Sequence, residues 1–438
     1  MVDKRIVTSK RTTLTIMTLI LASVVVSSYV PQRIATPTAA MESWRGAHPI
    51  LLPLVDALGL HHLYATPWFA LLVFLALVSL STSCVQQLRI AWRTTFCVTK
   101  GGEIGVLVAT DASRIASALT ARGYLRIGAA CNVIRCVKHP WGYWGNALLH
   151  VGMIVSVASS LFIALTQQRG AVFLQEGELF PPGARWQAEE HGAMARVLTL
   201  PMTVSLDRLR VSFMPDQHID RAASDLTFID GSGLAEHHTV GINDVLSYGD
   251  LTIYQRSDYG DLFRVSFTDE QGITHVESLP IGFPSSPAEA GYCDFRFPWL
   301  PYLISTKYYT DVARKSLGSP DRQLYLRLLD KEKREVARVS LQKGERAQLG
   351  RYSVQLLAVG RWSGLIFVRN SGMPFVFAGF FIIVLGGALT YMTPPREFIA
   401  SPGSGGYYVR WWAVRFSDFY RNEGEELMSA LQGENPDG

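Results

Sequence analysis

The chain has 438 residues, of which 48% are hydrophobic and 18% charged, and its formal net charge is +4. Its positive mean hydropathy indicates a membrane protein, and its length allows two or three domains. The excess positive charge lies largely beside apolar stretches, where basic residues usually meet anionic lipid headgroups, so we expect no nucleic-acid partner.

Four apolar stretches each come close to the roughly 20 residues needed to cross a bilayer about 30 Å thick. They cover residues 12–30, 67–84, 145–166 and 373–393, and none contains Asp, Glu, Lys or Arg. An even number of crossings places both termini on one side. The first stretch could instead be a cleaved signal peptide, but its apolar run exceeds the usual length of about 7–15 residues, so we expect a retained helix.

Flanking charges predict the orientation of these helices. Four basic residues precede the first stretch, and the connection 85–144 holds eight Lys and Arg residues against two acidic ones. By the positive-inside rule, the N-terminus and this connection are cytoplasmic. The region 167–372 would then lie outside, and the tail 394–438 would return to the cytoplasm.

The connection 85–144, which follows the two-helix segment 1–84, has the pattern of a small α/β structure. We expect a strand at 103–109, a helix at 111–122 and a hairpin formed by 124–128 with 132–137.

The region 167–372 contains short runs rich in β-branched and aromatic residues, separated by turn formers such as "DGSG" at 230–233. The runs are 171–175, 202–213, 226–230, 251–255, 262–269 and 352–360. They predict an antiparallel sandwich or open barrel, large enough to bury its own core. The expected fold is thus four transmembrane α-helices, a large extracytoplasmic mainly-β domain between the third and fourth, and a small α/β cytoplasmic connection between the second and third.

The tail after the fourth helix offers little patterning. Residues 401–406 are Gly-rich, and the basic, aromatic motif "RWWAV" at 410–414 is typical of an anchor at the membrane interface.

The cysteines do not indicate a disulfide. Four are on the expected cytoplasmic side, and Cys293 alone is outside. The four are Cys84, Cys97, Cys131 and Cys136. Cys-x-x-Cys is absent from the sequence, and Cys131 and Cys136 with His139 lack both the spacing of a zinc knuckle and an evident fourth ligand. We expect ordinary thiols.

Familiar catalytic signatures are also missing from the sequence: a Walker A loop, Gly-x-Ser-x-Gly, His-Glu-x-x-His and Cys-x-x-Cys-His. Any part in catalysis would therefore be as a component of a complex.

One ionisable side chain, His150, lies inside the third apolar stretch. Burying such a group in a membrane costs a few kcal/mol, so it usually faces other helices or a cavity. It could form a hydrogen bond between helices, or its imidazole could bind haem iron as an axial ligand. The sequence physics leaves both open. For His61 and His62, just before the second helix, we expect interfacial or surface placement.

In order and in expected sidedness, six segments together resemble the ResB family, also called CcsB. They are 30–32, 66–84, 144–162, 172–178, 242–255 and 372–387. Family members usually have Asn-x-Pro-Leu where this chain has Asn243, Asp244, Val245 and Leu246.

The resemblance implies half of a cytochrome c haem-lyase complex. It implies a ResC or CcsA-type membrane partner, haem b carried across the membrane, and apocytochrome c as the acceptor at Cys-x-x-Cys-His motifs. His150 matches the family histidine implicated in holding haem iron, and the chemistry is expected to centre on the partner. A haem-free membrane scaffold or sensor, binding a protein through its β domain, remains the alternative.

Overall fold

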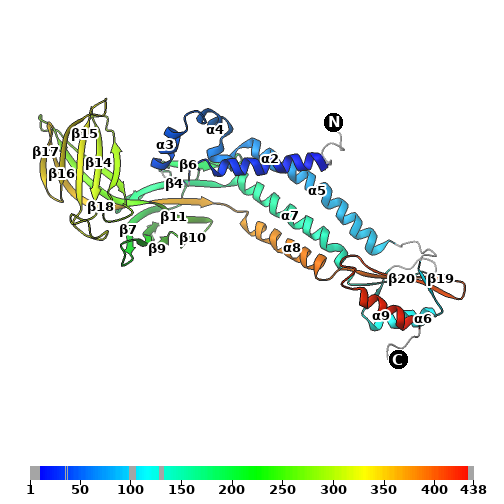
Figure 1. Cartoon of the computed structure of the whole chain (residues 1–438). Coiled ribbons are helices and arrows are strands. Elements are labelled where there is room, and N and C mark those ends of the chain that lie inside the picture. The colour runs from blue at the N-terminus through cyan, green and yellow to red at the C-terminus, as the bar shows by residue number, and fades with distance from the viewer. Residues whose placement is uncertain (1–9, 35, 37, 98–104, 128–132, 433–438) are drawn as a thin grey trace. The chain divides into compact units, whose positions relative to one another are not determined.

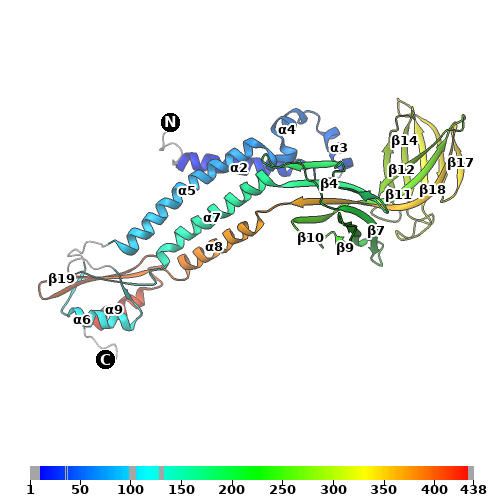
Figure 2. The same cartoon turned by 180° about the vertical axis from the view of Figure 1, so that it is seen from behind.

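A computed structural model describes residues 10–34, 36, 38–97, 105–127 and 133–432, and the chain forms two compact units (Figure 1, Figure 2). The helical unit consists of Met1–Val25, Pro67–Ala164 and Gly372–Gly438. The β unit consists of Val26–Thr66 and Leu165–Ser371.

Within the described residues, four helices are long and apolar enough to cross a membrane, which fits a multi-pass membrane protein. They are α2 (Lys10–Ser28), α5 (Pro67–Phe96), α7 (Gly142–Thr166) and α8 (Met373–Tyr391). The four predicted helices are confirmed. The predicted end of the second helix at residue 84 is wrong, because α5 continues through Arg89 and Arg93. Hydropathy locates only the apolar part of a helix, whereas backbone hydrogen bonds continue into the polar residues that follow it.

Helices α7 and α8 pack through glycines that bring their backbones into contact. A Cβ added to Gly152 would lie 2.7 Å from the carbonyl oxygen of Gly379, and one added to Gly386 would lie 2.6 Å from the amide nitrogen of Leu149. Only glycine fits such a contact, which is how membrane helices gain van der Waals packing without a hydrophobic driving force.

A five-stranded antiparallel sheet combines the connection between α5 and α7 with the tail after α8. Its strand order is β1 (Val106–Val108), β20 (Gly406–Ala413), β19 (Arg396–Gly403), β3 (Ile134–Lys138) and β2 (Leu125–Arg126). Helices α6 (Ala112–Ala121) and α9 (Arg421–Gln432) pack on it around a shared core. The predicted helix and hairpin of the connection are confirmed. The described part of the strand predicted at 103–109 is β1.

The tail is therefore part of a folded domain, and the interpretation of "RWWAV" as an interfacial anchor is wrong for Trp411. This residue lies in β20, and its Nε1 donates to the Tyr124 hydroxyl at 2.7 Å. A Cβ added to Gly424 of α9 would come within 2.5 Å of the Trp411 ring, so the indole packs flat against the helix backbone.

A buried ion pair joins this sheet to the ends of two membrane helices. Arg135 of β3 bonds Glu397 of β19 at 3.2 Å and donates to the carbonyl of Thr94 in α5 at 2.7 Å. The Tyr143 hydroxyl, in the first turn of α7, donates to the other oxygen of Glu397. Because both charged side chains are at least nine-tenths buried, each requires the other to remain ionised.

The β unit contains two sandwich-like lobes that share two 18-residue strands, β11 (Leu251–Thr268) and β18 (Tyr352–Arg369). The central sheet has the order β10-β11-β18-β4-β6, with β12 on β11 and β17 on β18. Its remaining strands are β4 (Gln168–Gln175), β6 (Ala188–His191), β10 (Leu246–Tyr248), β12 (Thr274–Gly282) and β17 (Arg346–Leu349).

Each lobe is closed by its own four-stranded sheet and has its own core. One sheet contains β5 (Leu179–Phe180), β7 (Thr203–Phe213), β8 (Ile219–Ile229) and β9 (Ala235–Gly241). The other contains β13 (Gly291–Phe295), β14 (Leu303–Tyr309), β15 (Gln323–Leu329) and β16 (Glu335–Leu341). A mainly-β domain between the third and fourth helices is confirmed.

The prediction of separate strands at 251–255 and 262–269 is wrong, because both belong to β11. The intervening "RSDYGD" has the composition of a turn, yet the pairing with β18 only shifts register between Gln255 and Tyr259. A Cβ on Gly260 would lie 2.0 Å from the carbonyl oxygen of Ile281, so the glycine serves a close strand contact.

The segment between α2 and α5 belongs to the β unit and contains α3 (Thr38–Ala47), α4 (Leu52–Leu58) and the 3-10 helix η1 (Leu60–Ala65). Arg256, at the register shift of β11, fixes its beginning. The guanidinium donates to the carbonyls of Ile34 and Thr36 and pairs with Asp258 at 2.7 Å. Both charged side chains are more than nine-tenths buried.

We expect Gly152→Ala to destabilise the protein by about 1–3 kcal/mol, because the new methyl group forces α7 away from α8. Gly387→Ala is the matched control on α8, since its nearest neighbour, a Leu149 methyl, lies at 4.0 Å. Thermal unfolding of the detergent-solubilised chain measures both. Equal melting temperatures for the two variants would contradict the backbone contact.

Arg256→Leu should lower the free energy of unfolding by about 3–5 kcal/mol, because it leaves the buried Asp258 carboxylate without its partner. Arg338→Leu is the control, since its ion pair with Glu335 is exposed and such pairs contribute about 0–1 kcal/mol. Denaturant unfolding followed by tryptophan fluorescence compares them, and similar losses would argue against the anchoring role of Arg256.

Candidate functional site

His150 lies on α7, eight residues after the helix begins at Gly142, which is about 12 Å along the axis at 1.5 Å per residue. The side chain is half-buried, and none of the residues that follow it in the helix is charged. The structure thus places an imidazole within an apolar spanning helix, as the sequence predicts.

The hydrogen bond of His150 determines which ring nitrogen is available. Its Nδ1 lies 2.8 Å from the main-chain carbonyl oxygen of Asn146, one turn earlier in α7. A carbonyl can only accept, so Nδ1 carries the proton, and in the neutral ring Nε2 keeps a free lone pair. That nitrogen can accept a hydrogen bond or bind a metal ion.

One of the two alternatives for His150 is a hydrogen bond between helices. The bond to Asn146 is not of this kind, because both residues belong to α7. The link between helices comes instead from Asn146, whose Nδ2 donates to Oε1 of Gln87 in α5 at 2.7 Å. Nothing in the sequence pattern marked this amide pair, although Gln87 and Asn146 are both polar residues at helix positions flanking apolar runs.

Helical geometry places His150 on the side of α7 that faces α5. At about 100° per residue, His150 is rotated by about 40° from Asn146, which contacts α5. It is rotated by about 140–160° from Gly145 and Gly152, which contact α8. Helix α7 therefore presents a close-packed glycine face to α8 and a polar face to α5.

His61 and His62 lie in η1 and are half-buried rather than on the surface. Their ring centroids are 4.4 Å apart, and Nδ1 of His61 lies 3.7 Å from an Asp56 oxygen. Burial, followed by the charge of His62, lowers the pKa of His61, and Asp56 opposes this shift.

Two of the described thiols, those of Cys136 and Cys293, have raised pKa values. Cys136 lies in the core of the α/β domain, and burial raises its pKa. Burial also raises the pKa of Cys293, which packs against the core of the lobe that contains β13–β16. Cys131 lies outside the described residues, so the structure adds nothing on its pairing with Cys136 and His139. Thiolate nucleophiles need the opposite shift.

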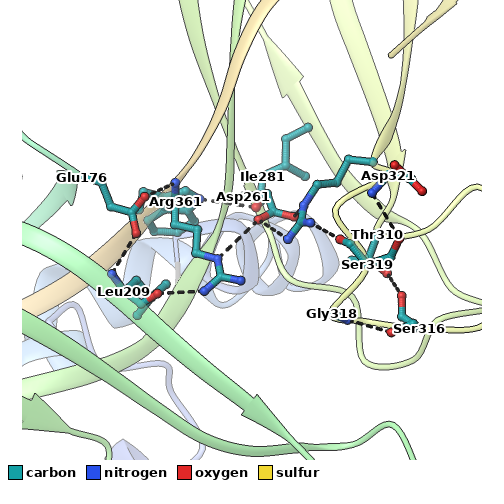
Figure 3. Close-up of polar contacts among 12 residues, drawn as sticks. Glu176, Leu209, Asp261, Ile281, Thr310, Ser316, Gly318, Ser319, Asp321 and Arg361 are labelled. Carbon is teal, nitrogen blue, oxygen red and sulfur yellow. Dashed lines mark hydrogen bonds and ion pairs between the residues drawn. The ribbon is translucent and has the colours of Figure 1, made fainter. Parts of the chain in front are cut away.

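A polar cleft of about 480 Å³ lies where β4, β7, β11 and β18 meet (Figure 3). Asp261 is fully buried there, 2.9 Å from Arg322 and 4.0 Å from Arg361. Burial raises the pKa of Asp261, and the two guanidinium groups oppose that rise. Sequence reasoning missed this cluster because Asp261 lies between the two strands predicted at 251–255 and 262–269.

Most of the charged groups around this cleft are satisfied by protein partners. Glu176 accepts from the amides of Leu209 and Arg361, and the Arg361 guanidinium donates to the carbonyl of Leu209 at 2.8 Å (Figure 3). These contacts join β7 of one lobe to the shared strand β18. They are what a structural junction requires and do not indicate acid–base chemistry.

Comparison with known proteins gives a consistent result. Residues 10–292 match the ResB-like family. The chain is similar to proteins named cytochrome c biogenesis protein CcsB from Picosynechococcus sp., Thermosynechococcus vestitus and Gloeobacter violaceus, with 23%, 26% and 23% identity. These matches cover 66%, 80% and 87% of this chain and 59%, 76% and 80% of the relatives. Because the family match spans more than half of the sequence, the chain belongs to the ResB-like family.

Proposed function

We propose that this protein is an accessory subunit in cytochrome c biogenesis that holds haem at His150 during its passage across the membrane. The observation that carries the proposal is the bond from Nδ1 of His150 to the Asn146 carbonyl, which leaves Nε2 free within an apolar helix. The names of its relatives support the process, since they are cytochrome c biogenesis proteins.

The chemistry of haem suits this environment. Haem is the cargo, and its iron takes an axial imidazole nitrogen, as in many haem proteins. A carbonyl that accepts a hydrogen bond from the other ring nitrogen fixes the orientation of the imidazole and raises its basicity as a ligand. Here that carbonyl belongs to Asn146, and Gln87 holds the Asn146 side chain against α5.

The remaining parts of the proposal concern sidedness and partners. With the N-terminus, the α/β domain and the tail in the cytoplasm, the β unit would lie outside, where apocytochrome c receives haem. A CcsA-type membrane partner would supply the site of covalent attachment, and the thiols would come from the Cys-x-x-Cys-His motif of the acceptor. The β unit would then dock the unfolded acceptor.

In this proposal, the complex of this chain with its CcsA-type partner purifies with a haem Soret band, and His150→Gly loses or shifts it. Added imidazole should restore the band in the His150→Gly variant by occupying the vacated position. Ser160→Ala, two turns or more further along α7, serves as the control and should keep the spectrum of the wild type. A colourless wild-type complex would favour the haem-free scaffold instead, and an unchanged His150→Gly spectrum would remove this residue from haem binding.

Gln87→Leu and Asn146→Leu should each weaken haem binding about threefold, because a hydrogen bond between membrane helices contributes about 0.6 kcal/mol on average. The double variant should be no weaker than the single variants, since both remove the same bond. Haem titrations followed by absorbance provide the three affinities. Thr13→Val breaks a bond of 2.7 Å to Ser79 between α2 and α5 and should leave the affinity unchanged. Additive losses in the double variant would show that the amide pair does not position His150.

A further inference from the structure

The polar cleft where β4, β7, β11 and β18 meet contains positive charge that its own carboxylates do not compensate. Four basic residues and three acidic ones line it. Asp261 compensates Arg322, because its two oxygens accept from two nitrogens of that guanidinium at 2.9 and 3.3 Å. The other three basic residues of the lining are Arg208, Lys343 and Arg361.

Arg361 of β18 is the most buried of these three. Its side chain is 23% exposed, and its Nε lies 4.0 Å from Asp261, which is too long for a hydrogen bond (Figure 3). Among the described residues its guanidinium donates one hydrogen bond, from Nη1 to the carbonyl of Leu209. The nearby Glu176 carboxylate accepts from main-chain amides instead. The remaining guanidinium donors of Arg361 are thus left for water or a ligand in the cleft.

Arg208 reaches the cleft from an irregular part of β7. The pairing of β7 with β8 shifts register between Leu206 and Arg208, and a bulge of this kind changes the direction of a side chain. Asp225 lies opposite Arg208 across the strand pair, but its carboxylate accepts from Arg210 at 2.6 Å. In the part of the chain that the structure describes, the Arg208 guanidinium has no hydrogen bond or ion pair.

Lys343 lies in the turn between β16 and β17. The turn is closed by a bond of 3.0 Å from the Glu345 amide to the Gln342 carbonyl, and Gly344 has a φ of 86° there. The Glu345 carboxylate accepts from the Gln342 amide at 2.8 Å, so this acid stabilises the turn. The Lys343 ammonium has no partner among the described residues either.

The open charges of the cleft are therefore mainly positive. Asp321 is the one carboxylate of the lining that has no partner in the described ranges. Against it stand three cations, from β7 of one lobe, from the turn after β16 of the other, and from the shared strand β18. Guanidinium and ammonium groups of this kind recognise carboxylate and phosphate oxygens.

The size of the cleft indicates the size of its ligand. Its volume of about 480 Å³ lies in the range of small-molecule sites, roughly 300–1,000 Å³. We propose that this cleft binds a small soluble anion with two or more carboxylate or phosphate groups, held by Arg208, Lys343 and Arg361.

Isothermal titration of the full chain in neutral detergent tests the site, with citrate or pyrophosphate as the probe and the ionic strength held constant with sodium chloride. Saturable binding is expected, and the tighter anion identifies carboxylate or phosphate as the preferred group. Arg208→Gln and Lys343→Gln should each weaken binding about tenfold, because each removes a charge-assisted hydrogen bond. Arg208→Lys keeps the charge and should recover part of the loss.

Arg210→Gln and Lys331→Gln are the matched controls, since each removes an exposed positive charge outside the cleft lining. Both should bind the anion like the wild type, and circular dichroism checks the fold of every variant. Absence of saturable binding for both anions would overturn the proposal. Equal losses in the cleft and control variants would also overturn it, because they would indicate diffuse surface charge. Neither result depends on haem binding at His150.

Discussion

Hydrocarbon offers no hydrogen-bond partner, and this constraint organises the helical unit. Each polar group placed among the spanning helices must find its partner within the protein. Asn146 donates a hydrogen bond to Gln87, Thr13 is hydrogen-bonded to Ser79, and Nδ1 of His150 donates to the main-chain carbonyl of Asn146. Each of these contacts fixes a helix rotation or a ring tautomer. A free imidazole nitrogen is thus a consequence of satisfying the other one.

The two sides of α7 serve different purposes under the same constraint. Toward α8, glycines allow backbone contact and leave no room for a ligand. Toward α5, longer polar side chains separate the helices and hold them by hydrogen bonds. Since His150 lies on this second side, a flat, apolar ligand would meet α5 rather than displace the close-packed α8.

Much of this arrangement was predictable from the sequence, and the limits have physical causes. Apolar length alone predicts the four helices. Because His150 is the single ionisable residue inside them, the sequence also marks it as the candidate site residue. Contacts such as Gln87 with Asn146 depend on helix rotation, which hydropathy does not encode. The composition of "RSDYGD" suggests a turn, yet its charged residues are paired within the fold: Arg256 pairs with Asp258, and Asp261 pairs with Arg322. The interpretation of Trp411 as an interfacial anchor fails for a similar reason, because its packing partner, Gly424, belongs to a separate helix.

The five-stranded sheet has a consequence for how the chain matures. Its central pair joins β3 to β19, and Arg135 meets Glu397 across a sequence separation of 262 residues. During synthesis β3 emerges early and must wait, with one edge unpaired, until the whole β unit and α8 have been made. The last strands to leave the ribosome therefore close the domain, so its completion reports that the final spanning helix has been inserted in the correct direction.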